Sequence, residues 1–142
     1  MLDSFFTNRE AMFLFDLLIA LVCGLIIGGE REFKGKPAGI STQTLVVSGS
    51  MIFAFLSQTL GGGDPTRIAA QIVSGIGFLG AGIILKSEKG NRVSNVTTAA
   101  SIWYSAAVGM AIGFNMHFIA LVSAIYAVVI SRIPHVGRRG DD

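Results

Sequence analysis

The chain has 142 residues, of which 51% are hydrophobic and only 14% are charged, and its mean hydropathy is +0.64. A water-soluble domain of this length needs more polar surface than such a composition provides, so a soluble globular fold is excluded. The formal net charge of +2 comes from short basic clusters between apolar segments rather than from one basic face, which argues against nucleic acid as a partner.

Five apolar segments follow one another along the chain. Each is close to the length at which a helix crosses a hydrocarbon layer of about 30 Å. A segment in lipid must satisfy its own backbone hydrogen bonds, so each is predicted to be a helix. The sequence therefore predicts an all-α polytopic membrane protein, a compact bundle of about five transmembrane helices within residues 1–135, followed by a short cytoplasmic tail, 136–142. The predicted spans are residues 11–29, 43–60, 67–85, 97–114 and 116–133.

Lysine and arginine are concentrated on one side of these spans. Nine of them follow the first, third and fifth spans, whereas Arg9 and Arg67 lie on the other side. Cytoplasmic loops carry the excess of basic residues in membrane proteins, so the N-terminus is predicted to lie outside and the C-terminus in the cytoplasm. The first span is expected to remain as an anchor, because neither the positive n-region nor the cleavage site of a signal peptide accompanies it.

Small residues recur every four positions in the first and fourth spans and so form a row on one face of each helix, and the third span is also rich in small residues. Membrane helices use such rows to approach one another closely. The spacing leaves open whether the rows meet within one chain or between the chains of a homo-oligomer. The helix-packing residues predicted on this basis are Gly24 and Gly28 in the first span, Gly77, Gly80 and Gly82 in the third, and Ser101, Ser105 and Gly109 in the fourth.

Polar residues near the outer ends of the spans are candidate functional residues. Asp16 in the first span lies at a depth similar to that of Arg67 and Gln71 in the third. A carboxylate facing lipid is expensive, so Asp16 is predicted to point into the bundle and to pair with Arg67. Asp64 is placed to cap the first free amides of the third span. A structural pair and an ion pathway are both open interpretations of these groups.

A charged collar follows the first span, formed by Glu30, Arg31 and Glu32 with Lys34 one turn after Glu30. The simplest interpretation is a solvated anchor in which Glu30 pairs with Lys34, and the alternative is a site for a cation or a partner protein. The two histidines of the chain are isolated and lack ligand spacing. His117 is therefore expected to be an interfacial or loop residue rather than a metal ligand.

Three stretches of the chain resemble the MgtC/SapB family of membrane proteins. Residues 64–82, DPTRIAAQIVSGIGFLGAG, resemble the family signature. Residues 28–32 (GGERE) with 36–39 (KPAG), and residues 97–103 (TTAASIW), resemble two further motifs in the same order. The family carries an arginine–threonine pair after the Ala-Gly turn, where this chain has Ile40-Ser41-Thr42. Longer members carry a soluble C-terminal domain, so a short form of the family is expected.

The resemblance implies a multi-pass protein of the bacterial inner membrane that supports adaptation to low magnesium and, in pathogens, survival inside macrophages. It further implies a non-enzymatic regulator of other membrane complexes, such as ATP synthase. The alternative is a magnesium or other cation transporter or channel that acts as an oligomer, with Thr97 and Thr98 among its lining hydroxyls. No catalytic or cofactor-binding residue is predicted, because no nucleophile is placed beside a base, and Mg²⁺ is the only ligand left open.

Overall fold

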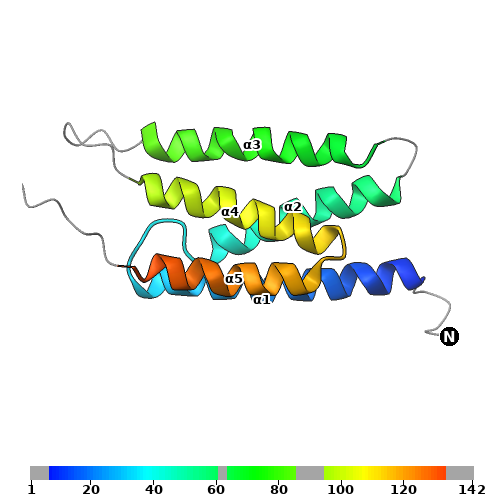
Figure 1. The fold of residues 1–142 in the computed structure, drawn as a ribbon, viewed down its shortest axis with the longest axis horizontal. Helices are drawn as coiled ribbons and strands as arrows, with labels where there is room; N and C mark the ends of the chain where they lie inside the picture. Colours follow the sequence, from blue (N-terminus) through cyan, green and yellow to red (C-terminus); the bar gives the residue numbers. More distant parts are fainter. Residues whose placement is uncertain (1–6, 61–63, 86–94, 134–142) are drawn as a thin grey trace, which may run out of the picture.

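The computed structural model describes residues 7–60, 64–85 and 95–133, and these form five α-helices (Figure 1). The helices lie side by side and run alternately in opposite directions, which confirms the predicted all-α bundle. The predicted tail, residues 136–142, lies outside the described residues. The helices are α1 (Asn8–Phe33), α2 (Ile40–Thr59), α3 (Thr66–Leu85), α4 (Val96–Gly113) and α5 (His117–Ser131).

Two ends of the bundle are distinguished below. The end at which α1, α3 and α5 begin is called the N-terminal end, and the end at which α2 and α4 begin is called the collar end. The sequence predicts that the N-terminal end faces outside. The helix α1 starts there with a capping box, in which the Thr7 backbone amide donates to the Glu10 carboxylate at 2.7 Å.

Four helices, α1 to α4, are long and apolar enough to cross a membrane, whereas α5 is shorter. Its 15 residues span about 22 Å, against a hydrocarbon layer of about 30 Å. The reason is that α4 and α5 are joined by a tight turn around Asn115, whose φ is 60°, and this turn lies deeper than the start of α1 (Figure 1). The five predicted segments are all helical, but the fifth is too short to be a full span by itself.

The closest helix contacts involve α2, which packs against α1 on one side and α4 on the other. A β-carbon at Gly24 would lie 2.5 Å from Thr44 Cα, one at Gly28 would lie 2.5 Å from Ile40 Cα, and one at Gly109 would overlap the carbonyl oxygen of Val47. These glycines therefore allow the backbones to approach, which confirms their predicted packing role. Both rows meet α2 of the same chain.

The helix α3 lies at the edge of the bundle and is the least buried of the apolar helices (Figure 1). Within the described residues it contacts α4 and α2 but neither α1 nor α5. Of its predicted packing residues only Gly80 is near another helix, with Ala99 Cβ 3.6 Å from a β-carbon built there. A β-carbon at Gly77 or Gly82 meets nothing within 4 Å, so these two glycines bring α3 into close contact with no other helix of this chain.

Candidate functional site

The collar end holds a buried arginine. The side chain of Arg31 is 1% exposed, so it is not the solvated anchor that the sequence predicted. Its Nη2 donates to the Pro37 carbonyl at 2.8 Å and to the Thr98 hydroxyl at 2.6 Å, and its Nε donates to the Ala38 carbonyl at 3.1 Å. The turn after α1 leaves carbonyls without helical partners, and the guanidinium supplies donors for them. Arg31 thus ties the α1–α2 turn to α4.

The charged neighbours of Arg31 have separate partners. Glu30 forms the predicted ion pair with Lys34, whose ammonium also donates to the Ser131 carbonyl of α5 at 3.0 Å. The Glu32 carboxylate accepts the Ile40 amide at 2.8 Å and so caps the first turn of α2. The two carboxylates therefore do not converge on one cation. Among the described residues no group of three or more histidine, cysteine, aspartate or glutamate side chains could hold a metal ion.

A buried amide extends the polar cluster toward the centre of the bundle. Gln43 of α2 is fully buried, donates to the Ser101 hydroxyl at 3.1 Å and accepts from the Ser105 hydroxyl at 2.6 Å. These hydrogen bonds confirm that the serine row of α4 faces another helix. Gln43 was not among the predicted site residues, although an amide in an apolar span is itself a signal of an interior position. The neighbouring Thr97, by contrast, is exposed.

The N-terminal end holds a second polar cluster, formed by Asp16 of α1 and His117 of α5. Asp16 is 1% exposed and points into the bundle as predicted. Its Oδ1 lies 2.6 Å from His117 Nε2, and its Oδ2 has no hydrogen-bond partner among the described residues. The predicted pairing with Arg67 is wrong, because Arg67 is exposed on α3 and α3 does not contact α1. Sequence spacing could not reveal His117 as the partner, since the tight α4–α5 turn brings the two together.

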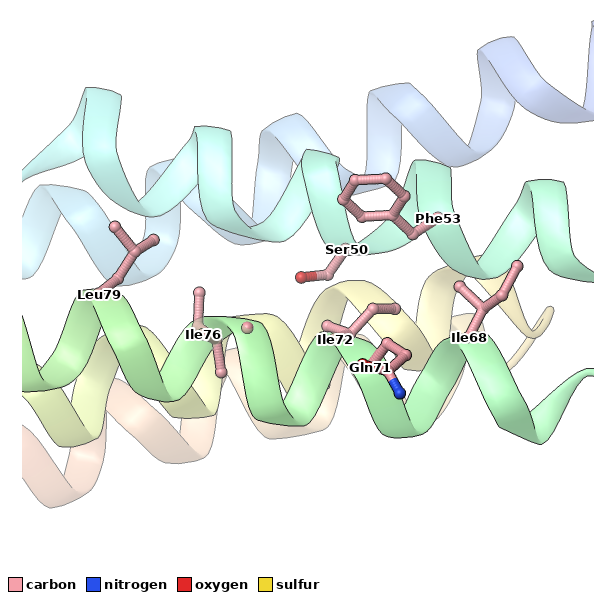
Figure 2. Close-up of a pocket in the computed structure, with 8 residues that line it drawn as sticks. Ser50, Phe53, Ile68, Gln71, Ile72, Ile76 and Leu79 are labelled. Carbon is pink, nitrogen blue, oxygen red and sulfur yellow. The ribbon is translucent and has the colours of Figure 1, made fainter.

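The start of α3 is capped as predicted. Asp64 Oδ1 accepts the Thr66 amide at 2.9 Å. Hydrogen bonding to the Thr66 side chain, and then to its backbone amide, lowers the pKa of Asp64. One turn further on, the exposed Gln71 lines an open apolar groove of about 450 Å³ between α2 and α3. Figure 2 shows Phe53 of α2 facing Ile72 of α3 across this groove.

A second groove separates α3 from α4. Its volume is about 400 Å³. The small residues Gly77, Gly80 and Ala81 form its α3 wall, and Ala100 and Trp103 belong to its α4 wall. The α3 wall comes from residues 76–84 and the α4 wall from residues 96–103, so two consecutive helices line one surface. We refer to this surface as the α3–α4 groove.

The two polar clusters are separated by the apolar core. This core fills the bundle between Asp16 at one end and the Arg31 cluster at the other. The buried residues of the core are Ala20, Cys23, Ile27, Val47, Met51, Val108, Ile112, Ala120 and Ala124. Cys23 is a buried free thiol there.

These features define a class of protein, a small polytopic membrane protein. Its interior polar groups mostly bond to one another, and one face of its third helix is not covered by the other helices of the chain. The chain belongs to the MgtC family, whose family model matches residues 17–137. This match includes α2 to α5 and most of α1, and it confirms the resemblance drawn from the three motifs.

Individual relatives agree with this assignment. The chain is 42% identical to Protein MgtC of Salmonella typhimurium (strain LT2) over 120 residues, which are 83% of this chain and 51% of that protein. It is 44% identical to Protein MgtC of Brucella abortus (strain 2308) over 115 residues, which are 80% of this chain and 48% of that protein. The chain thus spans about half the length of these relatives. No solved structure matches it.

Proposed function

We propose that this protein is a non-enzymatic regulator of the bacterial inner membrane, which binds a transmembrane helix of another membrane protein in the α3–α4 groove. In this proposal it acts on a larger complex, such as ATP synthase, and supports adaptation to low magnesium and, in a pathogen, survival inside host cells. The N-terminus lies outside and the C-terminus in the cytoplasm. The α3–α4 groove is the observation on which the proposal depends.

The rows of small residues on α1 and α4 allow α2 to pack closely against both helices. At Gly24 and Gly109 the backbone of α2 lies so close that no β-carbon fits. The corresponding surface of α3 also consists of small residues, yet a β-carbon at Gly77 would meet nothing within 4 Å. Small residues on a lipid-facing surface forfeit the van der Waals contact that larger side chains would make, whereas they favour close approach of a helix. A partner helix would complete on α3 the packing that α2 provides elsewhere.

Aromatic and polar groups beside the groove also suit a protein partner. Trp103 is about half exposed on the α4 wall, and aromatic residues often anchor interfaces in desolvated pockets. Elsewhere on α3, Ser74 is exposed and the exposed Gln71 lines the neighbouring α2–α3 groove, so this helix carries polar groups at or near the depth of the bilayer. Such groups gain from a hydrogen-bonding partner that hydrocarbon cannot supply.

A cation transporter that acts as an oligomer is the second candidate. Its support is the buried Asp16 carboxylate, one oxygen of which has no partner. The apolar core between Asp16 and the Arg31 cluster argues against a pathway through a single chain, because apolar side chains solvate an ion poorly. In this alternative Mg²⁺ or another cation would cross between chains.

Co-purification from native membranes under magnesium starvation tests the proposal. The variant Gly77→Leu adds bulk to the α3 wall of the α3–α4 groove at a position where a β-carbon meets nothing within 4 Å, so it should fold normally and lose at least tenfold of any co-purified membrane protein. The variant Ile119→Trp adds bulk to the exposed face of α5, which does not contact α3, and is the matched control. Equal recovery with both variants would refute groove binding. Magnesium flux into liposomes containing the purified protein would favour the transporter instead.

A further inference from the structure

We infer that a groove between α4 and α5 binds an anionic phospholipid at the collar end, with an acyl chain along the groove and the phosphate at its mouth. This groove borders the α3–α4 groove only at Ala100, and the argument does not depend on the proposed partner helix. It depends on the shape of the groove, on the basic side chains beside its mouth, and on the difference in charge between the two ends of the bundle.

The α4–α5 groove has a volume of about 170 Å³, and most of its lining is apolar. The helices α4 and α5 contact each other, and α4 begins at the end of the bundle at which α5 ends (Figure 1). Thr97, in the first turn of α4, and Ser131, the last residue of α5, line the groove at this collar end. Tyr104 and Tyr126 line it deeper in the bundle. The groove therefore runs from the membrane interface into the apolar layer.

The shape of this groove suits an acyl chain rather than a transmembrane helix. Its volume is less than half that of the α3–α4 groove, at about 170 Å³ against about 400 Å³. Membrane helices approach each other over small residues, whereas the rings of Tyr104 and Tyr126 belong to the walls here. Tyr126 is exposed and lies five residues before the end of α5, about 7.5 Å along the helix axis. Tyrosine is enriched near the lipid interface, where its ring meets hydrocarbon and its hydroxyl meets polar groups.

Hydrogen-bond donors lie beside the mouth of the groove. The Lys34 ammonium donates to the carbonyl of Ser131 at 3.0 Å and pairs with Glu30, so the described residues accept two of its three protons. Arg132 follows Ser131 directly and is exposed. On the other side, Asn95 makes no side-chain cap, so the first amides of α4 carry the positive end of the helix dipole without a side-chain acceptor. A phosphate at this mouth meets donors from both walls.

Arg31 adds a buried positive charge next to the first turn of α4. Its guanidinium is 1% exposed and donates to the Thr98 hydroxyl at 2.6 Å, and its Nη1 has no hydrogen-bond partner among the residues that the structure describes. A buried charge is costly without a counter-charge, and the neighbouring Glu30 already pairs with Lys34. An anion at the first turn of α4 therefore offsets a charge that the described side chains balance only in part.

The two ends of the bundle differ in charge. Within the described ranges, the collar end carries four basic and two acidic side chains, a net charge of +2, and the N-terminal end carries two basic and three acidic ones, a net charge of −1 with His117 neutral. The groups counted are Arg31, Lys34, Lys36, Arg132, Glu30 and Glu32 at the collar end, and Arg9, Arg67, Glu10, Asp16 and Asp64 at the N-terminal end. An anionic head group is thus attracted to the collar end, which the sequence predicts to face the cytoplasm. Basic pockets between membrane helices on that side bind anionic lipids in other proteins.

Native mass spectrometry of the full chain in detergent tests this inference with phosphatidylglycerol and phosphatidylcholine that carry identical acyl chains. The wild type should bind phosphatidylglycerol about fivefold more tightly or better. Arg132→Gln should weaken phosphatidylglycerol about fivefold, the effect of one basic residue on an anionic lipid, and leave phosphatidylcholine unchanged. The control Arg67→Gln removes an exposed arginine from the N-terminal end and should change neither affinity. Equal affinity of the wild type for the two lipids, or equal losses in the two variants, would overturn the inference.

A photoreactive lipid locates the acyl chain without any variant. Phosphatidylglycerol with a diazirine in one chain is irradiated with the wild type in phosphatidylcholine liposomes, and the labelled residues are identified by mass spectrometry. Ile130 in the groove should be labelled at least fivefold more than Val129, which is exposed at the same depth outside the groove. Unlabelled phosphatidylglycerol should suppress the label on Ile130, and inorganic phosphate should not. Equal labelling of the two residues would indicate surrounding lipid only, and suppression by inorganic phosphate would indicate a free-anion site; either result would overturn the inference.

Discussion

Replacement of Gly109 by leucine should separate α4 from α2. A β-carbon at this position would overlap the Val47 carbonyl oxygen and lie 2.9 Å from Ser50 Cβ, and the backbone of α2 cannot yield as a flexible side chain would. Overpacking costs about 1–3 kcal/mol, occasionally more. As α4 moves away, the hydrogen bonds of Gln43 with Ser101 and Ser105 lengthen, at about 1 kcal/mol each. The expected loss is therefore on the order of 3–5 kcal/mol.

The matched control for this prediction is Gly77→Leu, the same substitution on a helix of similar length. Nothing lies within 4 Å of a β-carbon at Gly77, so its effect on stability should stay within about 0.5 kcal/mol. The free energy of unfolding can be measured for both variants in bicelles by steric trapping. If Gly109→Leu were as stable as Gly77→Leu, the close α2–α4 contact described above would be wrong.

Three further predictions concern the polar clusters. Arg31→Lys should lower the free energy of unfolding by about 2 kcal/mol, because one ammonium cannot serve the turn carbonyls and α4 together; a neutral outcome would contradict the structural role of Arg31. Asp16→Ala should destabilise the protein and His117→Ala should add little to that loss in a double-mutant cycle, whereas Arg67→Ala should have no effect; a coupling of Asp16 with Arg67 instead would contradict the observed pair. The pKa of Asp64 is lowered in the folded protein, so its cap should be intact above the unfolded pKa and lost as pH falls through the folded pKa. Amide exchange in the first turn of α3 should then accelerate at acid pH, and Asp64→Asn should remove that pH dependence.

The helices could be predicted from the sequence because lipid imposes a length and a hydrogen-bonding rule on each apolar segment. The third predicted span, 67–85, differs by one residue from α3, Thr66–Leu85. The fifth, 116–133, begins one residue before α5, His117–Ser131, and ends two residues after it.

The polar contacts could be predicted only in part. The depth of Asp16 along its span correctly predicted an interior position. Residues of every helix lie at that depth, however, so depth alone does not identify the partner of Asp16. The neighbour depends on which helices touch, and α3 with Arg67 does not touch α1. Arg31 shows a similar limit, because a basic residue beside the membrane was predicted to be solvated. Its burial follows from the free carbonyls of the turn around Pro37, which only the folded turn reveals.

The rows of small residues could be predicted from the sequence, but the helix that packs on each row could not. The four-residue spacing predicted a packing face on α1 and α4, and the small residues of α3 predicted one there as well. The structure fills two of these faces with α2 and leaves the α3 face open. In lipid, helix association depends on such close packing and on interhelical hydrogen bonds rather than on the hydrophobic effect. An open face of this kind on an edge helix is therefore the surface at which a further helix can bind.

Photo-crosslinking in living cells tests binding in the α3–α4 groove most directly. A photoreactive amino acid replaces Trp103 on the groove wall, and in a second strain it replaces Ile119 on the exposed face of α5. Under magnesium starvation, the account predicts a crosslink to a membrane protein from position 103, lost in Gly77→Leu, and only lipid adducts from position 119. The same protein crosslinked from both positions, or lipid alone from position 103, would contradict it.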